Sequence, residues 1–316
     1  LMWLNRDMKL SAYMNKKKGE EIVKKEKFNF APYILILPAC LLMGLIMIYP
    51  LGKVFYLSFQ HYNPTKPFTN GFAGLDNFIT IFTKKEFYNA LGVSAKFVAC
   101  EVVLQLIFGM IVALILNQKF KGRGFFRALT FIPWALSGVL TAVLWSIMFN
   151  QHFGVLNDLL AKLGIIKEPI AWLANTKFVL GSVIVAELWR GIPFFAISLL
   201  AAMQGLPDDI YEAARVDGST KFQTFRFITL PMLKNTIVLT TLLRTIWEFN
   251  SVDLIYSLTG GGPVGKTTTL SMLIANQAIK TSNYGYGSAL SVVSFAILAV
   301  IAVIYMKLSG FGKEEA

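Results

Sequence analysis

The sequence predicts an all-α integral membrane protein with about six transmembrane helices. Its 316 residues are 55% hydrophobic and only 15% charged, whereas a soluble domain carries about 25% charged residues. Mean hydropathy is +0.57, and several windows of more than about 18 apolar residues carry almost no charge, as membrane spans do. Both cysteines, Cys40 and Cys100, lie inside apolar runs, so neither a disulfide framework nor a zinc site is indicated.

Six apolar stretches are each long enough to cross about 30 Å of hydrocarbon. They cover residues 32–59, 90–117, 125–150, 178–203, 231–252 and 287–307. The first stretch is predicted to be a retained span, because no small-residue cleavage site follows it. Pro32, Pro38 and Pro50 favour kinks or a broken start within it.

Lys and Arg are divided unevenly between the connections. The N-terminal tail, the connection after the second span, the connection after the fourth span and the C-terminal tail hold seventeen, against eight in the other three. Because cytoplasmic loops are enriched in Lys and Arg, residues 1–31, 206–231 and 308–316 are predicted to be cytoplasmic, flanking and interrupting a transmembrane domain over 32–307. The net charge of +12 is thus explained by membrane orientation rather than by nucleic-acid binding.

The connections on the other side are too long to be simple turns. Short helices are predicted near Asp76 to Phe82, from Asp158 to Leu163, and over 268–280. They fit an external cap that touches a partner, and they fit plain interfacial helices equally well.

The cytoplasmic connection 206–231 has a dense local pattern. Asp208 and Asp209 predict a helix start, since carboxylates are favoured there. Gly218 predicts the end of that helix, and Ser219 the start of a second short helix. Pro231 stands where the next apolar helix can begin.

The spacing within this connection is characteristic. Glu212-Ala213-Ala214, then three residues, Gly218, nine residues and Ile228-x-Leu230-Pro231 resemble the EAA loop of permease subunits of binding-protein-dependent ABC importers. The resemblance implies that the loop lies in a groove of an ATPase subunit and transmits its movement. The residues it assigns to this coupling are Glu212, Ala213, Ala214, Asp217, Gly218, Leu230 and Pro231.

Further motifs resemble the carbohydrate branch of these permeases, the maltose and glycerol-phosphate type. They are the run from Leu258 to Pro263, Phe131-Ile132-Pro133, and Trp189-x-Gly191-Ile192-Pro193-Phe194. The resemblance covers nearly the whole chain from about residue 30. It implies a sugar or oligosaccharide as substrate.

Residues 260–267, GGGPVGKT, also satisfy the pattern of a phosphate-binding loop, and 252–258 could form the strand before it. Such a loop needs a parallel sheet and an acidic metal ligand on a neighbouring strand. Here the flanking sequence is a membrane span and the charge count places the loop outside, so nucleotide binding is not predicted.

The resemblance also implies an assembly and a location. This chain would pair with a second, homologous permease above two cytoplasmic ABC ATPase subunits, and an extracytoplasmic sugar-binding protein would deliver the substrate. The ATPase subunits would bind ATP and Mg, and this chain would bind no cofactor. The expected location is the bacterial cytoplasmic (inner) membrane, with a multi-pass topology and both termini in the cytoplasm.

Ionisable residues inside the spans are costly and by default face the protein interior or a water-filled cavity. They follow helical spacing: Glu187 and Arg190 are three apart, Arg244 and Glu248 four apart. The candidates for lining a sugar passage are Glu187, Trp189, Arg190, Arg244, Trp247, Glu248 and Asn250. The alternative is that the charged ones form structural pairs, which is favoured for Glu101 and Gln105 of the second span. Two arginines would permit an acidic oligosaccharide, unless the neighbouring glutamates neutralise them.

The sequence contains no Gly-x-Ser-x-Gly, His-Glu-x-x-His or paired-cysteine motif, so this chain is not expected to be an enzyme. Two rival functions stay open. One is a self-contained ion- or proton-coupled secondary transporter that uses Glu187, Arg190 and Glu248 as a relay. The other is a membrane-embedded enzyme acting on a lipid-linked sugar.

Overall fold

The computed structural model describes residues 31–310. The predicted tails, 1–31 and 308–316, therefore lie almost entirely outside the described residues. The chain divides into two compact units, one ending at Lys53 and the other beginning at Val54. Over the described range both are helical, apart from one pair of two-residue strands in the second unit.

The first span is a single long helix. It consists of α2 (Ala31–Met43), the π-helical turn η1 (Gly44–Ile48) and α3 (Tyr49–Ser58). Residues 32–58 form one apolar segment of 27 residues, in good agreement with the predicted span. The helix continues past Pro38, and the irregularity in it is a π-helical turn rather than a break.

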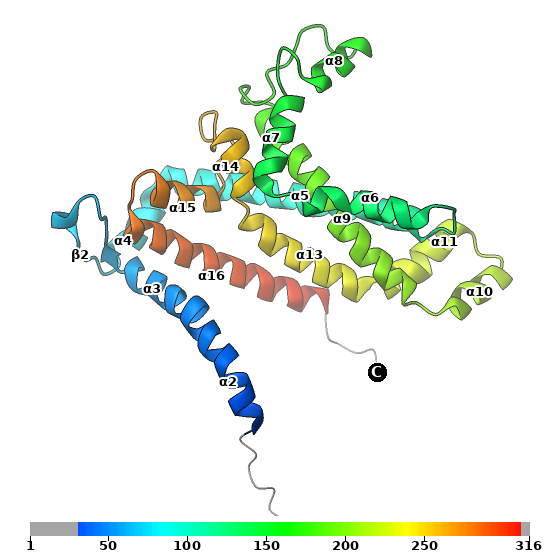
Figure 1. The fold of residues 1–316 in the computed structure, drawn as a ribbon, viewed down its shortest axis with the longest axis horizontal. Helices are drawn as coiled ribbons and strands as arrows, with labels where there is room; N and C mark the ends of the chain where they lie inside the picture. Colours follow the sequence, from blue (N-terminus) through cyan, green and yellow to red (C-terminus); the bar gives the residue numbers. More distant parts are fainter. Residues whose placement is uncertain (1–30, 311–316) are drawn as a thin grey trace, which may run out of the picture. The chain divides into compact units, whose positions relative to one another are not determined.

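The second unit is built on helices that run alongside one another (Figure 1). These are α5 (Lys85–Asn117), α9 (Val179–Gln204), α13 (Lys234–Phe249) and α16 (Tyr284–Ser309). Three of them, α5, α9 and α16, are long and apolar enough to cross a membrane and match the predicted spans within a few residues.

The prediction of about six spans is corrected in two places. Among the described residues four helices meet the length and hydropathy of a span, or five if one bent pair counts as a span. The stretch predicted at 231–252 forms the end of the short helix α12 (Leu230–Met232) and, after Leu233, helix α13. The 16 residues of α13 extend about 24 Å, less than the bilayer core of about 30 Å. The stretch predicted at 125–150 is divided into two helices.

The division falls between α6 (Arg123–Ala135) and α7 (Gly138–Met148), which are bent by 96°. Pro133 lies in the last turn of α6, and Ser137 caps α7 by accepting a hydrogen bond from the backbone N–H of Leu140 at 3.3 Å. A proline followed by a capping serine is a local signal for ending one helix and starting another. Hydropathy alone did not reveal it.

Close approach of α5 and α9 organises the core. A Cβ at Gly109 would overlap the Cβ of Phe195 and would come within 3.1 Å of the backbone nitrogen of Ala196. Glycine at this position therefore allows the two backbones to pack closely, as small residues do between membrane helices. Two apolar clusters result. One lies toward the start of α5, around Phe97, and the other toward its end, around Leu116.

The remaining helices lie in the connections. They include α4 (Asp76–Thr83), α8 (Val155–Lys162), α14 (Asp253–Thr259) and α15 (Leu270–Ile279), and the 3-10 turn η2 (Pro67–Thr69) precedes α4. The helices expected near 76–82, 158–163 and 268–280 are confirmed as α4, α8 and α15. Strands β1 (Gln60–His61) and β2 (Gly71–Phe72) pair antiparallel and were not predicted.

Candidate transport site and coupling loop

A buried polar cluster lies between the two apolar clusters. It combines residues of α5, α9 and α13: Glu101, Gln105, Glu187, Arg244 and Glu248. Each is at most 5% exposed. Because an unpaired charge in an apolar interior is very costly, the contacts among these side chains decide whether the cluster is stable.

The Arg244 guanidinium is the centre of the cluster. Its Nε donates to Gln105 Oε1 at 2.6 Å, and its Nη2 contacts Glu248 Oε1 at 2.6 Å and Glu187 Oε1 at 3.4 Å. Gln105 in turn donates from Nε2 to Glu101 at 2.8 Å and to Glu248 at 3.0 Å. One guanidinium group thus connects three helices, so the predicted pairs within helices are parts of one network.

Arg190 extends this network toward solvent. Its Nη2 donates to Glu187 Oε1 at 2.7 Å, and its Nη1 lies 3.8 Å from Asp253 at the start of α14. The side chain of Arg190 is 20% exposed and that of Asp253 48%. Of the two arginines predicted to line a passage, Arg190 is therefore the one with a solvent-accessible head group.

Two glycines leave the space that these contacts need. A Cβ at Gly191 would overlap the Gln105 amide and the Arg244 guanidinium. A Cβ at Gly138 would overlap the Asp253 carboxylate, so this carboxylate lies against the first residue of α7. A negative charge is favoured there, because the helix N-terminus carries partial positive charge.

A cavity of about 250 Å³ opens beside Arg190. Its lining residues are Glu187, Arg190, Arg244, Ile246, Trp247, Glu248, Asn250, Ser251 and Asp253. Trp247 is exposed and packs against Phe194, with the centroids of the two rings 5.1 Å apart. An aromatic face, amide and hydroxyl groups and one accessible guanidinium are the groups that can bind the apolar and hydroxyl faces of a sugar ring.

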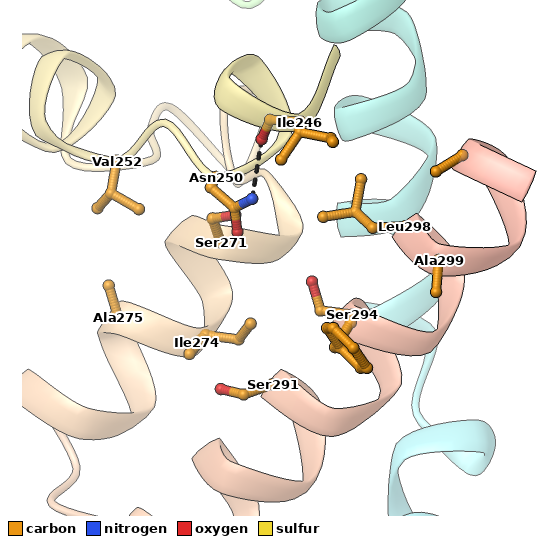
Figure 2. A pocket seen from close by; sticks show the side chains of 12 residues that line it. Ile246, Asn250, Val252, Ser271, Ile274, Ala275, Ser291, Ser294, Leu298 and Ala299 are labelled. Carbon is orange, nitrogen blue, oxygen red and sulfur yellow. Dashed lines mark hydrogen bonds between the residues drawn. The ribbon is translucent and has the colours of Figure 1, made fainter. Parts of the chain in front are cut away.

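Asn250 also faces a second, larger cavity of about 520 Å³ between α13, α15 and α16 (Figure 2). There the Asn250 amide donates to the backbone carbonyl of Ile246 at 2.8 Å, and Ser291 and Ser294 of α16 face it among apolar side chains. Trp189, the remaining predicted residue, is half-buried and packs on Trp145 rather than lining either cavity.

Six of the seven predicted passage residues therefore line one cavity. Three residues of the network were not among the candidates: Glu101, Gln105 and Asp253. For Glu101 and Gln105 the sequence offers a signal, two polar residues four apart within an apolar span. Asp253 offers none, since it follows the end of α13 and approaches Arg190 only through the fold.

The predicted coupling loop, residues 206–231, begins with α10 (Asp208–Val216), whose first turn carries Asp208 and Asp209 as predicted. Helix α10 is followed by Asp217 and then by Gly218, which has a left-handed conformation with a φ of 74°. The backbone N–H of Gly218 donates to Arg215 at 3.1 Å, and that of Ser219 donates to Ala214 at 2.9 Å. These two bonds form a Schellman motif, which glycine accommodates best.

The second half of the loop contains α11 (Lys221–Thr224), the π-helical turn η3 (Phe225–Thr229) and α12 (Leu230–Met232). Thr220, one residue later than predicted, caps α11 in a reciprocal capping box with Gln223. Pro231 lies in the first turn of α12, as expected for proline.

Exposure separates the predicted coupling residues into two groups. Ala214 is buried and Leu230 packs against the apolar cluster around Leu116, so both support the loop from within. Glu212, Ala213, Asp217, Gly218 and Pro231 are exposed. The loop also exposes Val216 at 88% and Phe222 at 74%. Neither residue was among the predicted coupling residues, although exposed apolar side chains in a polar loop are a signal for a contact surface.

The glycine-rich segment 260–267 is not preceded by a strand, because residues 253–259 form helix α14. Its folding is fixed by threonines: Thr267 Oγ1 lies 2.7 Å from Thr259 Oγ1, and the Thr268 hydroxyl donates to the carbonyl of Gly261 at 2.9 Å. The strand–loop–helix arrangement of a phosphate-binding loop is absent from these residues.

Comparison with known proteins gives a consistent result. The family model of binding-protein-dependent transport system inner membrane components matches residues 105–310. The trehalose/maltose transport system permease protein MalF of Thermococcus litoralis is 36% identical over 285 residues, covering 89% of this chain and 94% of that protein. The sulfoquinovosyl glycerol transport system permease protein SmoG of Agrobacterium fabrum is 34% identical, covering 87% and 89%.

A further relative, the trehalose transport system permease protein SugA of Mycobacterium tuberculosis, is 34% identical over 88% of both chains. Among solved structures, a chain of a bacterial ABC transporter involved in the import of the acidic polysaccharide alginate superimposes with a TM-score of 0.78. It is 22% identical and covers 92% of this chain and 98% of that one. At this identity the match supports the fold.

The fold and the family model together define a transport permease with several membrane-spanning helices. This chain belongs to the family of binding-protein-dependent transport system inner membrane components. It is a multi-pass protein of the inner membrane.

Proposed function

We propose that this chain is the transmembrane subunit of an ATP-driven importer for a sugar or oligosaccharide that an extracytoplasmic binding protein delivers. The observation that carries the proposal is the 36% identity, over 89% of the chain, to a trehalose/maltose permease. The cavity beside Arg190, with its tryptophan, amide and hydroxyl groups, supplies the chemistry that a sugar requires.

In this proposal residues 32–307 form the transmembrane domain, and its loop 206–231 is cytoplasmic. The N-terminal tail, residues 1–31, and the C-terminal tail, residues 308–316, are cytoplasmic as well. Two ATPase subunits bind ATP and Mg, and this chain binds no cofactor and catalyses no reaction. When the ATPase pair closes on ATP, the coupling loop moves the spans as rigid bodies between inward- and outward-facing states.

The contacts of the two arginines bear on the charge of the substrate. Arg244 is surrounded by Glu187 and Glu248, and Arg190 by Glu187 and Asp253. Within the described network the carboxyl groups outnumber the guanidinium groups. These arginines therefore give no support to an acidic substrate, and the site suits hydroxyl groups better than carboxylates.

Purification of the tagged chain in mild detergent, followed by mass spectrometry, tests the proposal. A second permease and an ATPase subunit are expected to co-purify, with ATPase activity stimulated by the loaded binding protein. A chain that purifies alone, and whose uptake stops with an uncoupler while remaining indifferent to ATP, would instead establish the secondary transporter.

The passage residues are tested by changing Arg190 to Gln. Because a hydrogen bond from a charged donor contributes about 1.5–3 kcal/mol, uptake per amount of assembled complex is expected to fall roughly 10- to 100-fold. Uptake is normalised to assembled complex because Arg190 is also the 2.7 Å partner of the buried Glu187. The measurement is uptake of radiolabelled maltose or trehalose, whichever the wild type transports. Arg123→Gln on α6, outside the cavity, is the matched control and should transport normally. Unchanged uptake with Arg190→Gln would remove this side chain from the passage.

A further inference from the structure

A large polar cavity lies far from the coupling loop. It has a volume of about 700 Å³ and is formed by the first turns of α5, the residues just before α9, and the glycine-rich segment. The coupling loop follows the other end of α9, so the 26 residues of this helix separate the two by about 39 Å. The Lys and Arg count that predicts a cytoplasmic coupling loop also predicts that this cavity lies on the extracytoplasmic side.

Three lysines from distant parts of the sequence line this cavity: Lys96 of α5, Lys177 before α9, and Lys266 of the glycine-rich segment. Among the described residues none of their ammonium groups has an ion pair or a hydrogen bond. Glu86 is the single acidic residue in the lining. The cavity therefore keeps an excess of two positive charges facing solvent.

The backbone around each lysine is held in place. The N–H of Lys177 donates to Asn175 Oδ1 at 2.9 Å, and that of Lys266 donates to the carbonyl of Pro263 at 3.0 Å. Leu270, the first residue of α15 and three residues after the glycine-rich segment, donates its backbone N–H to Ser94 Oγ of α5 at 2.7 Å, two positions from Lys96. The convergence of the three charges is thus built into the fold.

We infer that this cavity is a docking site for acidic side chains of the extracytoplasmic binding protein. A concave surface lined by charges of one sign concentrates its electric field and accelerates the association of an oppositely charged partner. A transport system of this family depends on a binding protein that must approach this end of the molecule. The inference rests on the proposed function and assigns Lys266, the lysine of the GGGPVGKT motif, to protein docking instead of phosphate binding.

Association kinetics test the inference. The complete complex is placed in nanodiscs of phosphatidylcholine. The association rate of the fluorescently labelled binding protein is then measured from about 50 to about 300 mM KCl, because surface charges are progressively screened over this range. The triple variant Lys96→Gln, Lys177→Gln, Lys266→Gln is expected to associate about tenfold more slowly at the lowest salt and to lose most of its salt dependence. Glu86→Gln is expected to associate about twofold faster, because it removes the opposing charge.

Lys162→Gln is the matched control, since Lys162 lies on α8, outside the cavity, and is already paired with Asp158 at 2.7 Å. It should associate at the wild-type rate. If the triple variant does not assemble, the single variants Lys177→Gln and Lys266→Gln are each expected to slow association about twofold.

Three results would overturn the inference. The first is a triple variant whose association rate and salt dependence equal those of the wild type. The second is a Lys162→Gln variant that associates as slowly as the triple variant. The third is association that added phosphatidylglycerol slows in the wild type but not in the triple variant. The last would show an anionic lipid in the cavity. A wild-type complex that binds no binding protein would contradict the proposed function as well, which separates the two failures.

Discussion

Replacing Gly218 by Asp is expected to abolish ATP-driven uptake while the chain still inserts and accumulates in the membrane. Gly218 has a φ of 74° and closes the Schellman motif at the end of α10. A residue with a side chain in this conformation costs about 1–2 kcal/mol, and the new carboxylate would stand beside Asp217 on the exposed face of the loop. Uptake in cells and the amount of chain in purified membranes are the two measurements.

Conformation and charge can be separated by further variants. A Cβ at Gly218 meets no atom within 4 Å, so Gly218→Ala changes only the backbone preference. Gly205, at the end of α9, has an ordinary φ of −86°, so Gly205→Ala is a matched control that should transport normally. Gly218→Asn should retain more uptake than Gly218→Asp, because asparagine tolerates the left-handed conformation and adds no charge. Normal uptake by Gly218→Asp would remove the coupling role from this residue.

Replacing Arg244 by Met is expected to destabilise the chain itself. Arg244 is the buried cation that contacts Glu187, Glu248 and Gln105 together. Removing one partner of a buried ion pair costs about 3–5 kcal/mol, because the remaining carboxylates are left uncompensated. The expected result is a marked loss of monodisperse protein after heating, measured by size-exclusion chromatography with fluorescence detection.

Second-site changes make this prediction specific. Glu248→Gln combined with Arg244→Met should recover part of the lost stability, because it removes one of the uncompensated charges. Arg244→Lys should recover less than full stability, since an ammonium group lacks the planar fork that contacts Gln105 and Glu248 at once. An Arg244→Met protein that melts like the wild type would show that the network contributes little to stability.

The coupling loop shows how much can be predicted from local pattern. Carboxylates after a proline, a glycine nine residues later and a proline before an apolar run each act on the few residues around them. The structure accordingly has α10, the left-handed Gly218 and Pro231 in the expected places. What the pattern did not indicate is which side chains turn outward: Ala214 is buried, whereas Val216 and Phe222 are exposed.

The spans show the limit of hydropathy. Long uninterrupted apolar runs gave α5, α9 and α16 within a few residues, because the bilayer sets a minimum length for any helix that crosses it. An apolar run says little about interruptions, so the 96° bend after Ala135 and the shortness of α13 were not anticipated. The bend depends on Pro133 and Ser137, which change average hydropathy little.

The sequence alone determined the class of protein, the ends of α5, α9 and α16 within a few residues, and the spacing that places Glu187 and Arg190 on one helical face. Helical periodicity places residues three or four apart on one face whatever surrounds the helix. Only the tertiary structure decided that Arg244 bonds to Gln105, 139 positions away in the sequence, and that three lysines share one cavity. The reason is physical: such neighbours depend on the rotation and separation of packed helices, which close contacts at Gly109 and Gly191 set.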